Sequence, residues 1–364
     1  MAGEITIDIA HRFESGVEVG ASLARTIAPG SILVLFGPSG AGKTTILRAI
    51  AGLMRPDRGR IVFEGRQWFD AAVDRCVPPQ ERRVGYVAQE TALFPHLTVR
   101  ANIEYGLRAA TAESRRQRAG ELIQLVGARG LEDRFPRQLS GGQAQRIALA
   151  RALAPSPAML LLDEPFGALD AATRRELRSE VRGVLRATGT SAILVTHDRL
   201  EAMAMGDELA VMIEGSLRQI GSVPEVFRRP ADPAVARSLD VETVVAATVD
   251  VASGGLIDLR IGHARLVAIA GPECAVGAEV FACMRAEDVV VQRDASAQGS
   301  ARNHLPGLVV GIEPEGAIDR VTVDCGFTLV AAITRQSREE LALVPGSPVT
   351  AAIKATAIHV VPKV

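Results

Sequence analysis

The chain has 364 residues, of which 48% are hydrophobic and 23% charged, an ordinary globular composition with room for two domains. Its 41 Lys and Arg residues against 42 Asp and Glu residues leave a formal net charge of −1, so overall charge does not favour binding to nucleic acid or anionic lipid. The N-terminus lacks the basic and apolar regions of a signal peptide, no apolar run is long enough to cross a bilayer, and the 4 cysteines form no C-x-x-C pair.

Residues 31–242 alternate short apolar runs with amphipathic stretches, which is typical of an α/β domain built on a parallel sheet. The predicted strands cover 31–36, 158–162, 191–195 and 208–213. The predicted helices cover 42–52, 171–188 and 199–205. We therefore expect residues 1–238 to form one α/β domain.

A helical insert is expected inside this domain. Between Gln89 and Leu139 only helical patterns occur, at about 99–109 and 112–127. The absence of strand-like runs there indicates a subdomain added to the sheet, and we place it at about 90–150.

The sequence changes character after Thr243, where short Val-rich alternating segments are separated by Gly, Pro and Asp. Residues 244–291 resemble residues 305–361 in their order of strands and Gly turns, and the connector 292–303 is polar. This repeat predicts two tandem β-barrels of the oligomer-binding (OB) type. The predicted boundaries are 243–364 for the domain and about 243–292 and 300–364 for the two barrels.

A glycine-rich segment, called the phosphate loop below, joins the first predicted strand to the first predicted helix. Its residues are Gly37, Pro38, Ser39, Gly40, Ala41, Gly42, Lys43 and Thr44, followed by Thr45, and they match the pattern G-x-x-x-x-G-K-[ST]. Backbone N–H groups in such a loop point at the phosphates of a nucleotide, Lys43 adds positive charge, and the Thr44 hydroxyl can bind Mg²⁺. Strand, loop and helix follow in the order that this chemistry needs, so the sequence favours a phosphate-binding loop over a purely structural turn.

Polar side chains follow three more predicted strands, at the edge where open α/β sheets bind ligands. Asp163 and Glu164 end the run AMLLLDEP, His197 follows AILVT, and Gln89 follows VGYVA. We expect Glu164 to act as general base toward the attacking water, His197 to contact the γ-phosphate, and Gln89 to reach the metal or the water. The predicted catalytic residues are thus Glu164, His197 and Gln89, and the predicted metal ligands are Thr44, Gln89 and Asp163.

A second glycine-bearing turn, LSGGQ at 139–143, begins another predicted helix. Ser140 followed by Gln143 is a capping box, which gives the turn a structural role at the helix N-terminus. One nucleotide site does not need both this turn and the phosphate loop.

In their order, these motifs resemble the ATP-binding-cassette (ABC) ATPases over roughly residues 1–235. The segments that carry the resemblance are the phosphate loop, Gln89, LSGGQ at 139–143, LLLDEP at 160–165, GALD at 167–170 and His197. The resemblance implies ATP and Mg²⁺ as cofactors. It also implies that Ser140, Gly141, Gly142 and Gln143 bind the γ-phosphate of ATP held by a second copy of the chain. Such sharing is physically sensible, because a helix N-terminus is an anion site and two copies related by a two-fold axis complete both sites at once.

Further roles follow from the same resemblance. Asp170 would link the two sites across the dimer, and Phe13 would either stack on adenine or be a core residue of a strand. The segment ETALFPHLTV resembles the surface that docks helices of a membrane-embedded partner, so Phe94, Pro95 and Leu97 are either exposed contacts or local core. The implied partners are integral membrane permease subunits and, indirectly, a periplasmic or extracellular solute-binding protein. The chain would then be a peripheral protein on the cytoplasmic face of the inner membrane.

The C-terminal region resembles the regulatory TOBE domains of importer ATPases and the small molybdate-binding barrels. Carried over by position, the contacts to a regulatory oxyanion would be Ser300, Arg302, Lys354 and Thr356, which supply charge-assisted hydrogen bonds. Arg285 takes the place of Lys354 in the first repeat.

The leading interpretation is an importer ATPase for molybdate, tungstate or a related oxyanion. Sulfate, ferric iron, a polyamine or a sugar are alternative solutes, because similar barrels occur in those importers without an anion. An oxyanion sensor or storage protein is an alternative of another class, and a cassette ATPase acting on DNA or ribosomes gains little support from the near-zero net charge.

Overall fold

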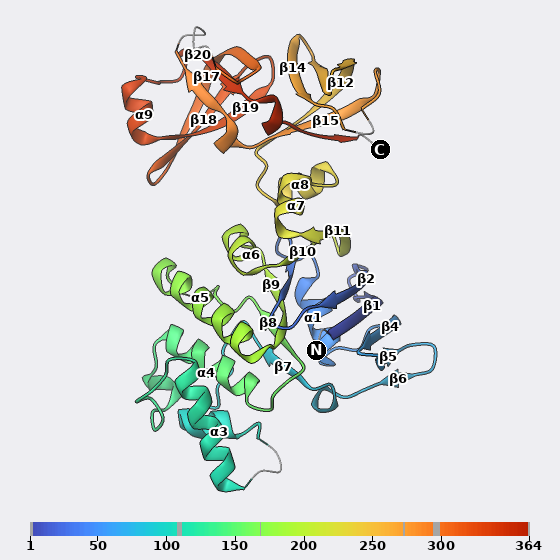
Figure 1. The fold of residues 1–364 in the computed structure, drawn as a ribbon, viewed down its shortest axis with the longest axis vertical. Coiled ribbons are helices and arrows are strands. Elements are labelled where there is room, and N and C mark those ends of the chain that lie inside the picture. The colour runs from blue at the N-terminus through green and yellow to red at the C-terminus, as the bar shows by residue number, and fades with distance from the viewer. Residues whose placement is uncertain (1–2, 108–110, 168, 272–273, 294–298, 363–364) are drawn as a thin grey trace. The chain divides into compact units, whose positions relative to one another are not determined.

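The computed structural model describes residues 3–107, 111–167, 169–271, 274–293 and 299–362, and it divides into two compact units, Met1–Pro224 and Glu225–Val364 (Figure 1). The predicted domain boundary at 238–243 lies after this division, because the short helices α7 (Val223–Arg228) and α8 (Pro233–Ser238) fall almost wholly in the second unit. None of the helices in the described part of the chain combines the length and the apolar character needed to cross a bilayer.

The first unit begins with an antiparallel sheet in the order β2-β1-β4-β5-β6. Its strands are β1 (Gly3–Arg12), β2 (Glu18–Ile27), β4 (Arg58–Phe63), β5 (Arg66–Asp70) and β6 (Arg75–Cys76). Along β1 the side chains of Ile5, Ile7 and Ile9 are buried whereas Glu4 and Asp8 are exposed. This period of two places one face of the sheet on the core.

The second sheet of this unit has the order β11-β10-β3-β9-β8-β7. Its strands are β3 (Ile32–Phe36), β7 (Val84–Val87), β8 (Met159–Asp163), β9 (Ser191–Thr196), β10 (Glu208–Ile213) and β11 (Ser216–Ser222). All pairs are parallel except β10 with β11. Every residue of β3, β8 and β9 is buried, as expected for parallel strands covered on both faces.

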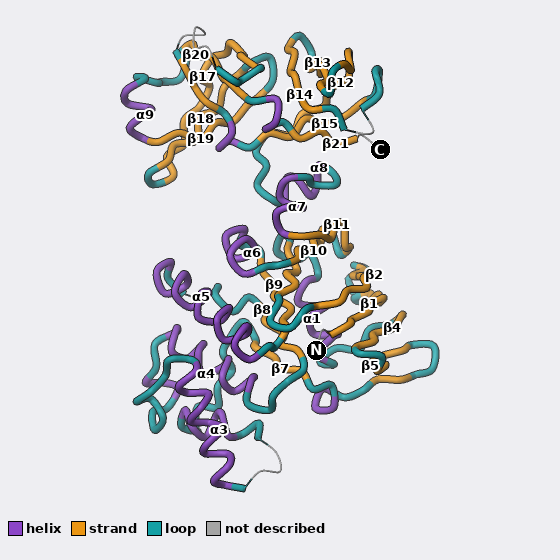
Figure 2. The backbone as a smooth tube through the Cα atoms, in the orientation of Figure 1, coloured by secondary structure: helices purple, strands orange, loops and turns teal. Residues whose placement is uncertain are grey.

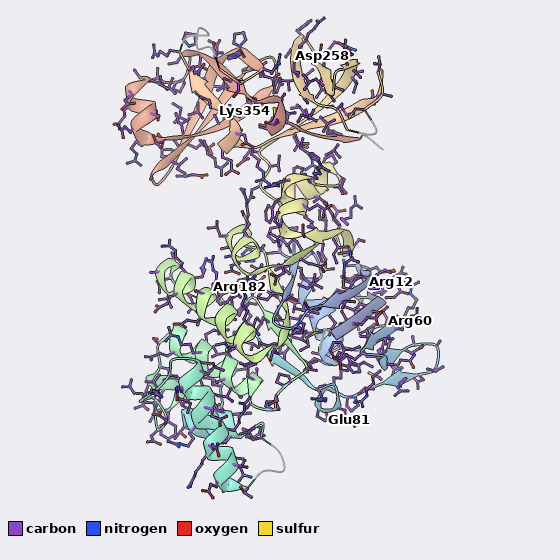
Figure 3. All side chains as sticks on the ribbon, viewed as in Figure 1. Arg12, Arg60, Glu81, Arg182, Asp258 and Lys354 are labelled. Carbon is purple, nitrogen blue, oxygen red and sulfur yellow. The ribbon has the colours of Figure 1, made fainter. Side chains whose placement is uncertain are left out.

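Helices cover both faces of this sheet. The helix α1 (Lys43–Ala51) shares one apolar core with the two sheets, and α5 (Ala171–Thr188) and α6 (Arg199–Met205) lie on the other side (Figure 1). Arg182 lies on α5 (Figure 3). It connects this helix to the turn before β10 by donating to Asp207 at 2.7 Å. Because β3, β9 and β8 are parallel neighbours, their carboxyl ends lie at the same edge of the sheet.

The helical insert is present, with α2 (Val99–Glu104), α3 (Ala112–Leu125) and α4 (Gly141–Leu153). Short 3-10 turns, η1 (Pro79–Glu81) and η2 (Pro136–Gln138), lie before and within it. The predicted helix 99–109 ends at Glu104 in the structure, and its residues 108 and 109 lie outside the described part of the chain.

The second unit consists of antiparallel sheets with the orders β14-β13-β12-β15-β21 and β16-β20-β17-β18-β19 (Figure 2). The first repeat supplies β12 (Thr243–Ser253), β13 (Leu256–Ile261), β14 (Ala264–Ile269), β15 (Glu279–Met284), η3 (Ala286–Asp288) and β16 (Val290–Gln292). The second supplies β17 (Asn303–Glu315), β18 (Ile318–Asp324), β19 (Thr328–Thr334), α9 (Arg335–Glu340), β20 (Pro348–Ile353), η4 (Ala355–Ala357) and β21 (His359–Pro362).

The two repeats exchange their last strands, and the predicted barrel boundaries at about 243–292 and 300–364 stay a prediction. The strand β16 pairs with β20 of the second repeat, and β21 pairs with β15 of the first. One apolar cluster also runs through both sheets. Each repeat therefore completes the sheet of the other. Part of the predicted connector 292–303, residues 294–298, lies outside the described residues.

Candidate functional site

The phosphate loop requires glycine at two positions for steric reasons. Gly37 has φ of 150° and a Cβ there would lie 2.0 Å from the carbonyl oxygen of Met212. Gly42 has φ of 91° and a Cβ there would lie 2.4 Å from Val19 Cγ1. Both positions are closed to L side chains, so the loop can keep its curved backbone only with glycine.

Lys43 lies inside this loop with 4% of its surface exposed. Its Nζ donates to the carbonyl oxygens of Gly37 and Pro38, each at 2.8 Å. Burial lowers the pKa of Lys43, and the negative charges of Glu164 and Asp163 oppose that shift. The ammonium is thus held by the same backbone that would cradle phosphates.

The other predicted loop residues differ in burial. Pro38, Ser39 and Gly40 are exposed at the rim, Ala41 is buried, and Thr45 is half-buried in α1.

The predicted metal ligands Thr44 and Asp163 lie together. Thr44 Oγ1 donates to Asp163 Oδ1 at 2.7 Å, and Asp163 is 3% exposed at the end of β8. Tyr86, on the neighbouring strand β7, donates its hydroxyl to Asp163 Oδ2 at 2.9 Å. Sequence analysis did not single out Tyr86, because the register between β7 and β8 is not visible in either strand alone.

The predicted catalytic residues Glu164 and His197 are also neighbours, with Glu164 Oε1 3.1 Å from His197 Nδ1. Glu164 has φ of 44°, a left-handed conformation that is unusual for a residue other than glycine. Its N–H donates to the carbonyl oxygen of Val195 on β9 at 3.0 Å. A strained residue held in this way at a strand end is typical of functional sites.

Gln89 is not brought to these groups. It is exposed and lies two residues beyond the end of β7, and among the described residues no hydrogen bond or ion pair joins it to Asp163, Glu164 or His197. Its role toward metal or water stays a prediction.

The LSGGQ turn, residues 139–143, caps helix α4 as predicted. Gln143 N donates to Ser140 Oγ at 3.3 Å and Ser140 N donates to Gln143 Oε1 at 3.0 Å. Ser140 and Gly141 are exposed, whereas Gly142 is buried against Thr173, whose Cγ2 would lie 2.8 Å from an added Cβ. The turn thus packs on the beginning of α5.

Asp170 is the N-cap of α5 and accepts hydrogen bonds from Ala172 N at 3.1 Å and Thr173 N at 3.0 Å. Its hydrogen bonds to Thr173 lower the pKa of Asp170, so it is anionic at neutral pH. Ala168, in the same GALD segment, lies outside the described residues.

Phe13 does not lie in the core of a strand. It follows the last residue of β1, is 38% exposed, and meets the ring of His11 edge to face at 4.7 Å. Arg12 beside it pairs with Glu18 at 2.9 Å (Figure 3). An exposed aromatic ring held from one side is compatible with stacking on adenine, and this role stays a prediction.

The segment 90–99 is held by side chains from helices α2 and α4. Arg151 donates to the carbonyl oxygens of Ala92 at 2.7 Å and Thr91 at 3.2 Å. The buried Asn102 accepts a hydrogen bond from Phe94 N at 2.8 Å and donates to the carbonyl oxygens of Phe94, Leu97 and Thr98. Phe94 and Leu97 are half-buried and Pro95 is exposed, and a docking role for this surface stays a prediction.

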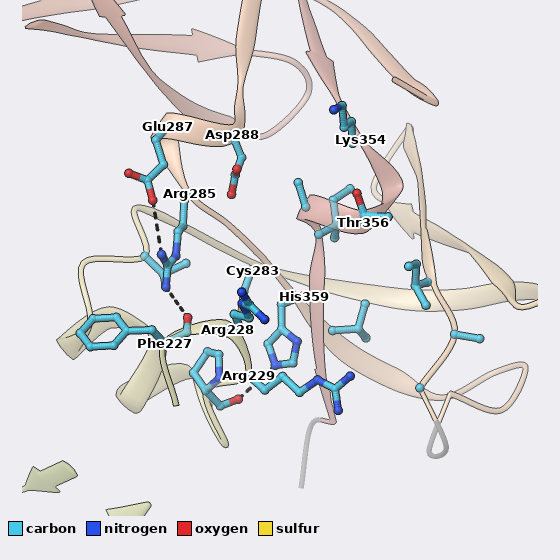
Figure 4. Close-up of a pocket in the computed structure, with 18 residues that line it drawn as sticks. Phe227, Arg228, Arg229, Cys283, Arg285, Glu287, Asp288, Lys354, Thr356 and His359 are labelled. Carbon is cyan, nitrogen blue, oxygen red and sulfur yellow. Dashed lines mark hydrogen bonds and ion pairs between the residues drawn. The ribbon is translucent and has the colours of Figure 1, made fainter. Parts of the chain in front are cut away.

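The second unit contains a cavity of about 680 Å³, called the C-terminal cavity (Figure 4). Arg285 immediately precedes η3 and Lys354 immediately precedes η4, so the two repeats contribute equivalent cations to it. Of the four residues predicted to contact an oxyanion, Lys354 and Thr356 line this cavity, whereas Ser300 and Arg302 do not.

The cavity carries more positive than negative charge. Its permanent cations are Arg228, Arg229, Arg285 and Lys354, and its carboxylates are Glu287 and Asp288. Arg285 donates to the carbonyl oxygen of Phe227 and to Glu287 Oε1, the latter at 3.3 Å (Figure 4). An anion is the ligand that such a lining would favour.

At one edge of the parallel sheet lie a phosphate loop with a lysine, a hydroxyl–carboxylate pair, and a second carboxylate beside an imidazole. These features define a nucleoside triphosphatase of the P-loop class. Residues 21–167 match the family model described as ABC transporter, and residues 299–360 match the TOBE domain. The chain is 38% identical over 342 residues to the molybdate/tungstate import ATP-binding protein WtpC of Pyrococcus horikoshii, covering 92% of this chain and 94% of that one. It is 40% identical over 322 residues to the sulfate/thiosulfate import ATP-binding protein CysA of Thermosynechococcus vestitus, covering 88% and 87%.

A solved dimeric ATP-binding cassette in a post-hydrolysis state, bound to ADP and phosphate, superposes with a TM-score of 0.51 and 29% identity. The match covers 61% of this chain and 98% of that one. The chain belongs to the ABC transporter family, as an ATP-binding importer ATPase with a C-terminal TOBE region.

Proposed function

We propose that the chain hydrolyses ATP as a two-fold dimer in which each ATP lies between the phosphate loop of one copy and the LSGGQ turn of the other. The observation that carries this proposal is the exposed Ser140 at the N-terminus of the 13-residue helix α4, in a chain that already has a complete phosphate loop. The N–H groups of such a helix terminus attract anions, and solved cassettes with this fold are dimeric.

The residues at the strand ends then divide the chemistry of hydrolysis. Lys43 offsets phosphate charge, Glu164 takes the proton of the attacking water, and His197 holds Glu164 Oε1 while facing the γ-phosphate. Thr44 and Asp163 present hydroxyl and carboxylate oxygens 2.7 Å apart, a donor set that suits Mg²⁺. When bound there, Mg²⁺ would neutralise charge on the β- and γ-phosphates.

Mixing two inactive variants tests the shared site. Lys43→Ala disables the phosphate loop and Ser140→Arg disables the turn, so a mixed dimer keeps one intact site. In a Glu164→Gln background, we expect the mixture to retain bound ATP after gel filtration although neither parent does. Ser114→Arg, which alters another exposed serine in the first turn of a helix, is the matched control. A mixture that retains no more ATP than its parents contradicts the shared site.

The same proposal places the protein at the cytoplasmic face of the inner membrane, bound to permease subunits through the surface around Phe94, Pro95 and Leu97. Pro95 is exposed and Asn102 fixes the backbone beneath it, so this surface is both accessible and rigid. A solute-binding protein would act only through the permease.

For the solute we propose molybdate or tungstate, because the relative that matches 92% of the chain is named for them and the TOBE region spans 299–360. Sulfate, ferric iron, a polyamine or a sugar are the alternatives. ATPase activity of the transporter assembled with its permease and binding protein should rise with molybdate and tungstate. Stimulation by sulfate alone would favour the second relative's substrate.

We also propose that the C-terminal cavity is a regulatory anion site involving Lys354 and Thr356. Equivalent cations from both repeats support it, whereas the positions of Ser300 and Arg302 outside the cavity do not. Calorimetry of the full chain against molybdate, tungstate and sulfate tests the site, with Lys354→Ala expected to abolish the heat. An oxyanion sensor or storage protein needs neither Lys43 nor Glu164, so their geometry disfavours that alternative.

A further inference from the structure

The carboxylate of Asp163 is held at both oxygens. Thr44 Oγ1 donates to Oδ1 at 2.7 Å, and the Tyr86 hydroxyl donates to Oδ2 at 2.9 Å. Because Asp163 is 3% exposed, water cannot easily replace either donor. Two donors from different elements fix the rotation of the carboxylate about its last single bond.

The sheet explains why Tyr86 reaches this carboxylate. In the parallel pairing of β7 with β8, Tyr86 lies opposite Leu161, and Asp163 is two residues further along the same face. Arg48, on α1, interacts with the same hydroxyl. A tyrosine hydroxyl has an ordinary pKa of about 10, so it carries its proton and donates at neutral pH.

We propose that Tyr86 is a positioning residue for ATP hydrolysis, whose hydroxyl turns Asp163 so that Oδ1 faces Thr44 and the metal ion. The inference rests on the proposed binding of Mg²⁺ by Thr44 and Asp163. It adds a donor from β7 to a site otherwise built from the phosphate loop and β8. Hydrogen-bond partners of groups around a metal commonly tune its affinity by about 10- to 100-fold.

The position of Tyr86 in the chain gives this contact a second consequence. The strand β7 ends at Val87, and Gln89 follows where the chain leaves the sheet for the helical insert. One hydrogen bond, from the Tyr86 hydroxyl to Oδ2 of Asp163, connects this segment to the proposed metal site. Tyr86 thus links Asp163 to the strand that leads into the helical insert.

The test is Tyr86→Phe, which removes the hydroxyl and keeps the ring. Tyr105→Phe is the matched control, since Tyr105 is the other of the 2 tyrosines and is 67% exposed. Paramagnetic resonance of Mn²⁺ added to the ATP complex measures metal affinity directly. We expect Tyr86→Phe to weaken Mn²⁺ binding about tenfold, with ATP binding in EDTA unchanged and Tyr105→Phe indistinguishable from the parent. Steady-state kinetics should show a raised half-saturating Mg²⁺ concentration and a kcat that recovers at high Mg²⁺.

A second substitution separates failure of this inference from failure of the proposed metal site. If Tyr86 acts through Asp163, then Tyr86→Phe should have no further effect on Mn²⁺ affinity in an Asp163→Asn background. Normal Mn²⁺ affinity in Tyr86→Phe with reduced affinity in Asp163→Asn overturns the role of Tyr86 alone. Normal affinity in both variants overturns the metal site and this inference together. Should Tyr86→Phe not fold, Tyr86→Met fills similar volume and is judged by the same measurements.

Discussion

Glu164 Oε1 lies 3.1 Å from His197 Nδ1, although the whole of α5 and of β9 separates the two residues in the sequence. They meet because Asp163 on β8 is the register partner of Val195 on β9, so the residues just beyond these positions leave the sheet side by side. The parallel sheet thus places the proposed base beside the residue that orients it.

Glu164→Gln should abolish hydrolysis while leaving ATP binding and the fold intact. The amide keeps the shape of the side chain but cannot take a proton from water, so we expect kcat to fall by about 10²- to 10⁴-fold. Because ATP then persists between the copies, gel filtration with ATP and Mg²⁺ should show a stable dimer. Glu214→Gln is the control, as Glu214 also has a positive φ, 48°, but lies exposed in the turn after β10. A Glu164→Gln protein that stays monomeric in ATP and Mg²⁺ contradicts the proposed ATP-bound dimer.

Gly142→Ala should displace the LSGGQ turn. An added Cβ would lie 2.8 Å from Thr173 Cγ2, closer than real side-chain atoms approach, so either the turn or α5 has to move. Small displacements of positioning groups cost up to about 10²-fold in rate, and we expect a loss of that order in ATPase activity. The double variant Gly142→Ala/Thr173→Ser removes the opposing methyl group and should restore most of the activity. No rescue by Thr173→Ser would assign the loss to another cause.

Gly183→Ala should stabilise the first unit, unlike Gly142→Ala, which should displace a turn. Gly183 is exposed in the middle of α5, and an added Cβ there would meet no atom within 4 Å. Alanine lowers the conformational entropy of the unfolded chain and favours the helix, so the free energy of unfolding should rise by about 0.5–1 kcal/mol. Differential scanning calorimetry measures the change, and an unaltered ATPase rate confirms that α5 keeps its position.

The parts of the fold that follow from local pattern were predictable from the sequence. The predicted helices 171–188 and 199–205 coincide with α5 and α6, because Asp170 and Asp198 cap their first turns and Gly189 ends α5 with φ of 63°. The predicted strands 158–162 and 191–195 agree with β8 and β9, where complete burial demands an unbroken apolar run.

Features that depend on pairing between distant segments were not predictable in this way. The exchange of β16 and β21 between the C-terminal sheets leaves each strand's alternation unchanged, so either pairing fits the same sequence. Tyr86 and Asp163 meet only through the register of β7 on β8. Ser300 and Arg302 precede β17 and lie outside the C-terminal cavity. The resemblance predicted their residue types as oxyanion contacts but could not predict where they lie in the fold.

Arg82 is a buried cation that supports the phosphate-loop helix from its far end. It is 1% exposed and donates to the carbonyl oxygens of Ala49, Ile50 and Val77 at 2.6, 2.8 and 2.8 Å. Arg82→Met would remove the donor to the carbonyl oxygens of Ile50 and Val77, whereas that of Ala49 keeps the N–H of Gly52, and we expect the free energy of unfolding to fall by about 3 kcal/mol. Urea denaturation followed by the fluorescence of Trp68, which packs near Arg82 and is the 1 tryptophan of the chain, measures the loss.

The neighbouring Arg83 provides the control for this experiment, because its side chain is exposed. Arg83→Met should change stability by no more than about 0.5 kcal/mol. Equal destabilisation by the two substitutions would mean that the hydrogen bonds of Arg82 to α1 contribute little.

His359 should make the second unit sensitive to mild acid. Burial lowers the pKa of His359, and Arg229 lowers it further, while the carbonyl oxygen of Pro230, 3.3 Å from Nε2, opposes the shift. His359 therefore binds a proton less readily in the folded unit than in the unfolded chain, where it is protonated below about pH 6.5. The contribution of His359 to stability is complete above that pH and is lost as pH falls toward the depressed value. We expect the C-terminal melting transition to move to lower temperature on acidification, and His359→Gln, whose amide can still donate to Pro230, to flatten this dependence. His263→Gln, at an exposed turn between β13 and β14, should leave the slope unchanged, and a slope equally reduced in both variants would remove His359 as its source.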